Sequence, residues 1–221
     1  MEKEKPIGVF DSGIGGLTVV KRIVSYLPRE DIIYFGDTAR VPYGSKSNDT
    51  VIEYGLQDAR FLMHKNIKAL VIACNTVSSV ALNNLKNNFD IPIIGMIEPG
   101  AKMASRETKN KRIGVIGTRS TISNKAYSKK IKSLDPSIQV FEHSCPLFVP
   151  LAEEGWINHK ATYEIAKEYL KEFIKIGIDT LVLGCTHYPI LAGVIQDIVG
   201  KDVKLIDSGI AAAESVKEEL D

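Results

Sequence analysis

Short apolar runs rich in valine and isoleucine alternate with longer stretches of helical period along the whole of this 221-residue chain. Such alternation is typical of a parallel α/β architecture, because consecutive parallel strands need a crossover connection, which is usually a helix. Most of the runs are apolar throughout, as strands covered by helices on both faces are. The clearest helix is expected over 160–175, where apolar side chains recur at helical spacing. Strands are expected over 6–10, 31–35, 69–73, 92–97, 112–116, 139–141, 180–183 and 204–206.

The chain also repeats itself loosely. Residues 7–12 can be laid on 113–118, and residues 69–76 on 180–187, in the same order and at nearly the same offset. Any two buried strands look alike in their valine and isoleucine content, but this does not explain a cysteine at the same place in each. We therefore infer a duplication, and we predict an α/β fold made of two similar halves, each with its own parallel sheet.

Proline and glycine punctuate the chain at Pro99 and Gly100, shortly before the second set of strands begins. We place the domain boundary here. The first α/β domain would comprise 1–97 plus 208–221, and the second 98–207. Because ligands of parallel α/β sheets bind at the carboxyl ends of the strands, the active site is expected in the cleft between the two domains.

Composition excludes several classes of protein. A hydrophobic content of 44% and a charged content of 25% are ordinary for a globular domain and argue against disorder. A formal net charge of +1 gives no indication that the protein binds nucleic acid or an anionic membrane surface. The first ten residues have no apolar segment typical of a signal peptide, and we expect a cytoplasmic protein. The three cysteines have no CxxC spacing, which suggests neither a disulfide framework nor a zinc knuckle.

Cys74 and Cys185 are the residues most suggestive of chemistry. Each ends an apolar run and precedes small polar residues that suit a helix N-cap. Since a helix N-terminus lowers the pKa of a thiol, we predict that each is partly thiolate near neutral pH. A single cysteine in this place would be interpreted as packing, and two could form a redox pair. Two like groups on either side of a carbon centre could also invert it by reversible proton transfer.

A glycine-rich loop over 11–17 follows the first expected strand and opens a helix. It does not fit a dinucleotide-binding loop, because Thr18 stands where GxGxxG would need glycine or alanine, and GxxxxGK[ST] is absent. We predict that the loop holds a small carboxylate, with a tight structural turn as the alternative. Asp11 could orient a thiol or an ammonium group, or could simply cap the helix.

These segments together resemble the sequence motifs of bacterial glutamate racemases, in the right order and over nearly the whole chain. The resemblance rests on five segments, namely 11–17 (DSGIGGL), 41–44 (VPYG), 73–76 (ACNT), 150–155 (PLAEEG) and 184–189 (GCTHYP). It implies a cofactor-independent racemase of two pseudo-symmetric α/β domains, with no metal, which interconverts L- and D-glutamate for peptidoglycan synthesis. It also implies a homodimer, and the family usually continues somewhat beyond Asp221, which implies a further C-terminal helix.

The resemblance also implies roles for individual residues. Cys74 and Cys185 would be the two catalytic acid/base residues. Asp11 would assist Cys74, while His187 and Glu153 would assist Cys185. The implied substrate contacts, made through hydroxyl, amide and backbone N–H groups, are Asp11, Ser12, Tyr43, Gly44, Asn75, Thr76, Thr118, Thr121, Thr186 and His187.

Other interpretations stay open at this point. The chain could be an aspartate or hydantoin racemase of the same superfamily, although His187 after Cys185-Thr186 and the opening of the 11–16 segment favour glutamate. A two-lobed amino-acid-binding protein would use the cysteines only for packing, and a thiol–disulfide enzyme would use them as a redox pair. Cys145 has no counterpart in the repeat and is assigned to packing, and His64, His143 and His159 have no partner residues in the sequence.

Overall fold

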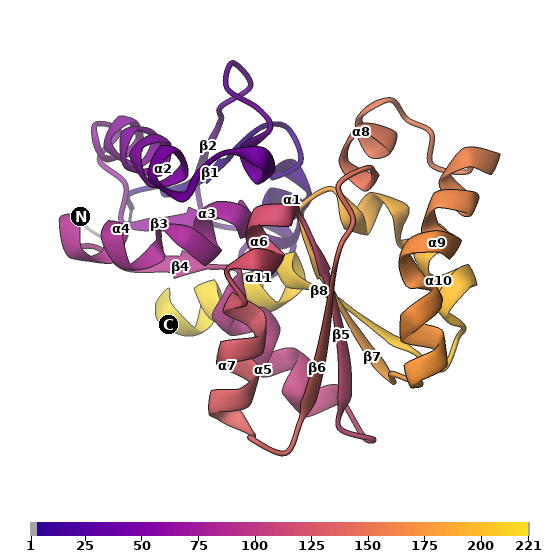
Figure 1. The fold of residues 1–221 in the computed structure, drawn as a ribbon. Helices are drawn as coiled ribbons and strands as arrows, with labels where there is room; N and C mark the ends of the chain where they lie inside the picture. The colour runs from indigo at the N-terminus through magenta and orange to yellow at the C-terminus, as the bar shows by residue number, and fades with distance from the viewer. Residues whose placement is uncertain (1–3, 221) are drawn as a thin grey trace.

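The computed structural model describes residues 4–220, which form two four-stranded parallel sheets flanked by helices (Figure 1). The first sheet has the order β2-β1-β3-β4 and the second β6-β5-β7-β8. The elements of the first half are β1 (Ile7–Asp11), α1 (Leu17–Tyr26), β2 (Ile32–Gly36), the 3-10 helix η1 (Tyr43–Ser45), α2 (Asn48–Met63), β3 (Ala69–Ile72), α3 (Asn75–Val80), α4 (Leu82–Asn88) and β4 (Ile93–Gly95).

The second half contains the remaining elements, with a short 3-10 helix after its third strand. They are α5 (Ile97–Glu107), β5 (Arg112–Gly117), α6 (Arg119–Ser123), α7 (Ala126–Leu134), β6 (Gln139–Ser144), α8 (Phe148–Glu153), α9 (Lys160–Ile176), β7 (Thr180–Gly184), η2 (Tyr188–Leu191), α10 (Ala192–Val199), β8 (Lys204–Asp207) and α11 (Ser208–Leu220).

Every strand expected from the sequence is present, with small differences at the ends. The strand expected over 139–141 continues to Ser144, because it pairs along the full length of β5. The strand expected over 92–97 ends at Gly95, because Met96 already has helical backbone angles and begins α5. The helix expected over 160–175 is confirmed as α9, with His159 as its N-cap and Gly177 in the left-handed conformation (φ 70°) as its C-cap.

The two sheets have equivalent topology, which confirms the two similar α/β halves predicted from the repeat. Strand β1 occupies the same place in its sheet as β5, and β3 the same place as β7. These are the strands whose sequences can be superposed. Cys74 and Cys185 therefore follow equivalent strands, each at the carboxyl end of its sheet.

Helix α11 returns to the first half after the last strand of the second sheet (Figure 1). Its residues Ala212, Ala213 and Val216 are buried in one cluster with Ile7 and Val9 of β1. Helix α5 packs against both α7 and α11, so it contacts elements of both halves. The exact division at 97/98 and 207/208 stays a prediction. Within 4–220, no helix combines the length and the hydropathy needed to cross a membrane.

Candidate active site

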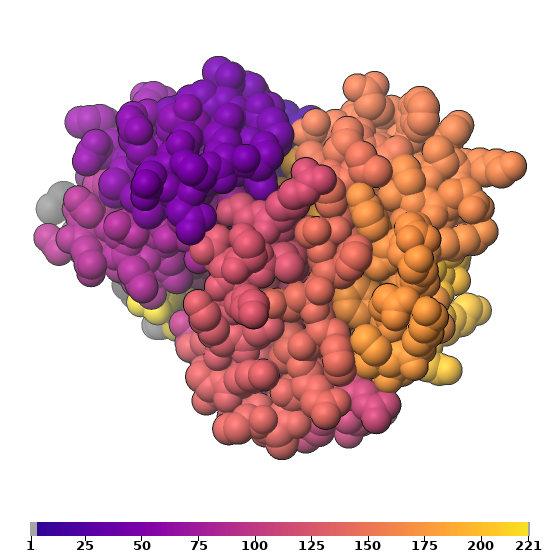
Figure 2. Space-filling view, viewed as in Figure 1, coloured from indigo at the N-terminus to yellow at the C-terminus, as the bar shows by residue number. Residues whose placement is uncertain are grey.

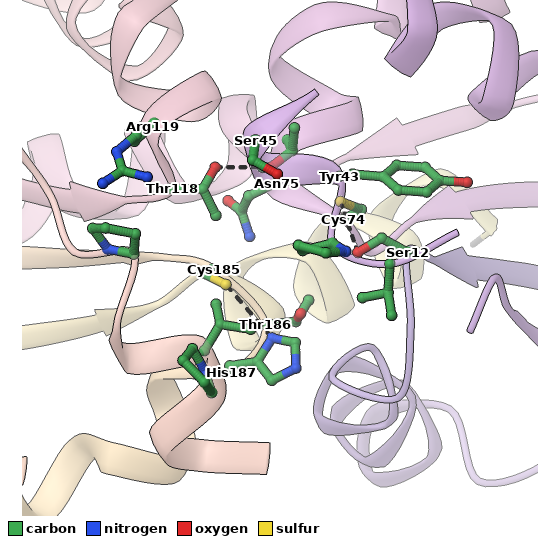
Figure 3. Close-up of a pocket in the computed structure, with 17 residues that line it drawn as sticks. Ser12, Tyr43, Ser45, Cys74, Asn75, Thr118, Arg119, Cys185, Thr186 and His187 are labelled. Atoms are coloured by element: carbon green, nitrogen blue, oxygen red, sulfur yellow. Dashed lines mark hydrogen bonds between the residues drawn. The ribbon is translucent and has the colours of Figure 1, made fainter. Parts of the chain in front are cut away.

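A pocket of about 120 Å³ lies between the two halves, where the carboxyl ends of both sheets meet (Figure 3). The space-filling view shows the two halves packed against each other (Figure 2). A cavity of this size can hold a small molecule. Its lining residues come from both halves: Ser12, Val41, Pro42, Tyr43, Gly44, Ser45, Cys74, Asn75, Thr76, Thr118, Arg119, Pro146, Val149, Pro150, Cys185, Thr186 and His187.

Cys74 reaches the pocket from the first half, as the N-cap residue of α3. Its side chain is 5% exposed, and its Sγ lies 3.7 Å from the Ser12 hydroxyl (Figure 3). Burial raises the pKa of the Cys74 thiol to about 12, and the nearby carboxylate of Asp11 acts in the same direction. The thiol is therefore protonated at neutral pH in the unliganded protein.

Cys185 reaches the same pocket from the end of β7, in a chain of polar contacts. Its Sγ lies 3.7 Å from Nδ1 of His187, whose Nε2 lies 3.0 Å from Oε1 of Glu153 on α8. Cys185 and His187 are buried, whereas about a third of the Glu153 side chain is exposed. Burial raises the pKa of the Cys185 thiol, and the neighbouring Asp11 and Cys74 raise it further.

The prediction that both thiols are partly ionised is therefore wrong for the unliganded protein. The helix that follows Cys74 has only six residues, and the turn after Cys185 leads into the four-residue 3-10 helix η2. The favourable field of such short elements is small, whereas removing a thiolate from water is costly. Burial therefore outweighs the helix N-terminus at both sites.

Asp11 is fully buried at the end of β1 and does not line the pocket. Its Oδ2 accepts a hydrogen bond from the Gly16 N–H at 2.9 Å, and the N–H groups of Ser12 and Gly13 also face the carboxylate. Three N–H groups of the glycine-rich loop thus face the loop's own carboxylate. The prediction that the loop holds a small carboxylate stays a prediction, and Ser12 of the loop lines the pocket. Oδ1 has no partner within the part of the chain that is described, and burial raises the pKa of this carboxyl.

Three threonine hydroxyls form a cluster that joins the halves beside the pocket. Thr76 on α3 lies 2.9 Å from Thr118 and 3.3 Å from Thr121, and Thr118 lies 3.0 Å from Thr121. Hydroxyls can reorient as donors or acceptors, so Thr76 and Thr118, which line the pocket, can serve a ligand carboxylate. Asn75 also lines the pocket, but its amide is bonded to Tyr127 and Ser208.

The structure brings most of the predicted site residues to the pocket, but not Asp11, Thr121 or Glu153, which stand behind its wall. Their catalytic and binding roles stay predictions. Some lining residues were not predicted from the sequence, namely Val41, Pro42, Ser45, Arg119, Pro146, Val149 and Pro150. Arg119 had a usable signal, since it lies two residues after the carboxyl end of β5.

Gly15 is the place where the first half packs most tightly on the Cys185 side of the pocket. A Cβ added here would lie 2.6 Å from both Cε1 of His187 and Oγ1 of Thr186. Gly15→Ala is therefore expected to displace His187 and to lower kcat by roughly tenfold to a hundredfold. The measurement is steady-state kinetics together with thermal melting. Gly193→Ala on α10 is the matched control, because nothing lies within 4 Å of its added Cβ. Equal activity of the two variants would contradict the expectation.

Comparison with known proteins agrees with this architecture. The family model for Asp/Glu/hydantoin racemases matches residues 7–216, nearly the whole chain. The chain belongs to the Asp/Glu/hydantoin racemase family, and it is an amino-acid racemase, an isomerase.

Within this family, the chain is similar to glutamate racemases. The chain is 54% identical over 216 residues to the glutamate racemase of Geobacter metallireducens, covering 98% of this chain and 80% of that protein. The structure of glutamate racemase RacE1 from Bacillus anthracis superposes with a TM-score of 0.96 at 41% identity, covering 99% of this chain and 82% of that one. The structure of the glutamate racemase from Francisella tularensis in complex with D-glutamate superposes with a TM-score of 0.93 at 44% identity. The match covers 99% of this chain and 81% of that one. The resemblance to glutamate racemases is thus confirmed.

Proposed function

We propose that this racemase interconverts L- and D-glutamate by proton transfer at Cα between two cysteines. The observation that carries the proposal is that Cys74 and Cys185, which follow equivalent strands of the two sheets, line one pocket (Figure 3). Two chemically equivalent groups are what a reaction needs when it must run in both directions from mirror-related substrates.

In the proposed reaction one sulfur is a thiolate and the other a thiol. The thiolate takes the proton from Cα as the C–H bond breaks, and the opposite thiol donates its proton to the other face of the carbanion. The first cysteine ends as the thiol and the second as the thiolate, so the reverse reaction uses the same groups with their roles exchanged. Charge on the carbanion is stabilised by polar groups already in place around a site from which water is excluded.

Neighbouring residues would support each sulfur in turn. We propose that His187, oriented by Glu153, exchanges protons with Cys185 across the 3.7 Å contact between Sγ and Nδ1. On the other side of the pocket, the Ser12 hydroxyl would favour the thiolate form of Cys74, and Asp11 would favour its thiol form. The positively charged α-ammonium of a bound amino acid also favours the thiolate, which offsets the burial that raises both thiol pKa values.

An acidic amino acid suits the charge of this pocket. Arg119 is the one cationic Lys or Arg side chain among its lining residues, and no ion pair is recorded for it within residues 4–220. The threonine hydroxyls supply further hydrogen-bond donors for carboxylate oxygens. The relative from Francisella tularensis, which shares 44% of its aligned sequence with this chain, was solved with D-glutamate.

The test is a side-by-side assay of racemisation with L-glutamate, D-glutamate, L-aspartate and D-aspartate, followed by circular dichroism. We expect kcat/KM for glutamate to exceed that for aspartate by at least roughly a hundredfold, because the shorter side chain leaves a buried polar group unpaired. Equal or higher activity on aspartate would contradict glutamate as the preferred substrate and would indicate aspartate instead. Binding of glutamate without any racemisation would instead support the amino-acid-binding alternative.

We further propose that the protein acts in the cytoplasm as a homodimer and supplies D-glutamate for peptidoglycan. Support comes from the glutamate racemase relatives. Light scattering of the purified protein tests the dimer. Depletion of the protein in its own cells, with and without added D-glutamate, tests the supply of precursor.

A further inference from the structure

A buried polar cluster reaches the pocket through Tyr43, and the proposed reaction does not use its two carboxyls or its arginine. It consists of Asp37 after β2, Arg40, Tyr43 on η1 and Asp58 on α2, and we call it the Asp37–Asp58 cluster. Asp58 is 1% exposed, Tyr43 1% and Asp37 5%. Such a group of titratable side chains needs every hydrogen bond filled, because unpaired polar atoms are costly when buried.

The hydrogen bonds of this cluster require one additional proton. The Tyr43 hydroxyl contacts Oδ2 of Asp37 and also lies 2.9 Å from Oδ2 of Asp58. A phenol has one hydrogen and can donate to only one of these carboxyls. If it donates to Asp37, then Oδ2 of Asp58 either carries a hydrogen of its own or faces a lone pair of the phenol oxygen.

The contacts of Arg40 identify Asp58 as the carboxyl that carries this proton. Arg40 donates from Nε to Oδ2 of Asp37 at 2.5 Å and from Nη2 to Oδ1 of Asp58 at 2.8 Å. In a protonated Asp58, Oδ1 is then the carbonyl oxygen that accepts from Arg40, and Oδ2 is the hydroxyl that donates to Tyr43. One arginine charge balances one carboxylate, that of Asp37, and each of the four contacts of the cluster joins one donor to one acceptor.

We propose that Asp58 is a positioning residue. Its carboxyl stays protonated and donates a hydrogen bond to the Tyr43 oxygen, which fixes the segment 41–44 as a wall of the substrate pocket. This segment is well placed for such a role, because Tyr43 and Gly44 both line the pocket. A Cβ added at Gly44 would lie 2.6 Å from Cβ of Thr118, so the segment also packs closely on the other half. The effect on the substrate rests on the proposed function, whereas the proton on Asp58 does not.

The surroundings of Asp58 support a raised affinity for this proton. Burial is the main cause that raises the pKa of Asp58 to about 7, and Asp37 and Asp11 raise it further, against the lowering effects of Tyr43 and Arg40. Helix α2 also packs against β1, which carries Asp11, and against β2, α3 and α4. Of these, β2 carries Tyr34, which bonds to the Gly13 carbonyl; Cys74 caps α3; and α4 carries Lys86, which is exposed.

The first experiment observes the proton directly and needs no substrate. Infrared difference spectra of the wild type minus Asp58→Asn are expected to show the carbonyl band of a protonated carboxylic acid at pH 6, which fades by pH 9. Asp49→Asn, in the exposed first turn of the same helix, is the matched control and should show no such band. A spectrum without the protonated band at pH 6 would overturn the proposal, whatever reaction the enzyme catalyses.

The second experiment measures stability against pH. The pKa of Asp58 rises from 3.8 when unfolded to about 7 when folded, so the proton it retains stabilises the fold fully below pH 4. This contribution is lost as the pH rises from about 4 to about 7. The Tm of Asp58→Asn minus that of the wild type is therefore expected to increase over this window and then stay constant. A difference that does not change with pH would contradict the proposal.

The third experiment tests the effect on substrate binding. From pH 6 to pH 9 the KM for glutamate of the wild type and of Asp49→Asn is expected to rise severalfold, as Asp58 loses its proton. The KM of Asp58→Asn should stay within about twofold, since an amide donates to Tyr43 at every pH. The same rise in Asp58→Asn as in the wild type, with the infrared band present, would overturn the positioning role alone. Absence of racemisation in all three proteins would overturn the proposed function and leave the infrared result standing.

Discussion

Serine in place of Cys74 or of Cys185 is expected to reduce racemisation of glutamate by roughly a thousandfold in both directions. General acid–base catalysis by one positioned group is worth about 10²–10⁴ in rate, and a serine hydroxyl is a far weaker acid than a thiol. Both variants should keep the fold, since serine differs from cysteine by one atom. The measurement is the initial rate from each enantiomer, with circular dichroism spectra to confirm folding.

Cys145 provides the matched control for this pair of variants. It is a third buried free thiol, it lies in the core cluster of the second half, and it does not line the pocket. Cys145→Ala is expected to lower the Tm while keeping kcat/KM within about threefold of the wild type, since the change leaves only a small cavity. Retention of more than about a tenth of the activity by either Cys74→Ser or Cys185→Ser would contradict the proposed mechanism.

The second large effect concerns how slowly the two pocket thiols react before substrate binds. With a pKa of about 12, only about one Cys74 side chain in 10⁵ is a thiolate at pH 7, against a few per cent for an ordinary cysteine. Alkylation of Cys74 by iodoacetamide is therefore expected to be on the order of a thousandfold slower than that of a free cysteine. Its rate should still increase about tenfold per pH unit beyond pH 9.

Peptide mass spectrometry after timed alkylation measures this rate at each cysteine. Unfolding the protein in urea is the control, because it exposes the same thiols to solvent and should restore the ordinary reactivity. A rate at Cys74 that levels off below pH 9 in the folded protein would show that the thiol ionises readily without substrate. Under the present account, the α-ammonium of the bound amino acid favours the thiolate that the reaction requires.

Much of the fold could be predicted because the strands are buried on both faces and leave a clear apolar pattern. The cysteines after β3 and β7 carried the most information, since they marked both the duplication and the pocket. The strand limits were less accurate. Met96, for example, continues the apolar run of β4 but already belongs to the start of α5, a change of backbone conformation to which its side-chain type gives no clue.

The electrostatics of the site could not be predicted from the sequence. Helix capping suggested a lowered thiol pKa, but the burial that decides the sign depends on how the two halves close over the cysteines. Similarly, the sequence did not reveal that the N–H groups of Ser12, Gly13 and Gly16 in the glycine-rich loop face the carboxylate of Asp11. The cluster of Asp37, Tyr43 and Asp58 joins a loop, a 3-10 helix and a long helix, and local spacing does not reveal such a contact.

Isotope incorporation at Cα in D₂O tests the central claim most directly. If two opposed sulfurs act, a proton is removed from one face and a solvent-derived deuteron is added to the other. Starting from L-glutamate, the D-glutamate formed at early times should carry deuterium at Cα, while the remaining L-glutamate stays unlabelled. The same should hold from D-glutamate with the labels exchanged. Early product that retains its original hydrogen, or substrate that becomes labelled as fast as the product, would show that a single group serves both faces.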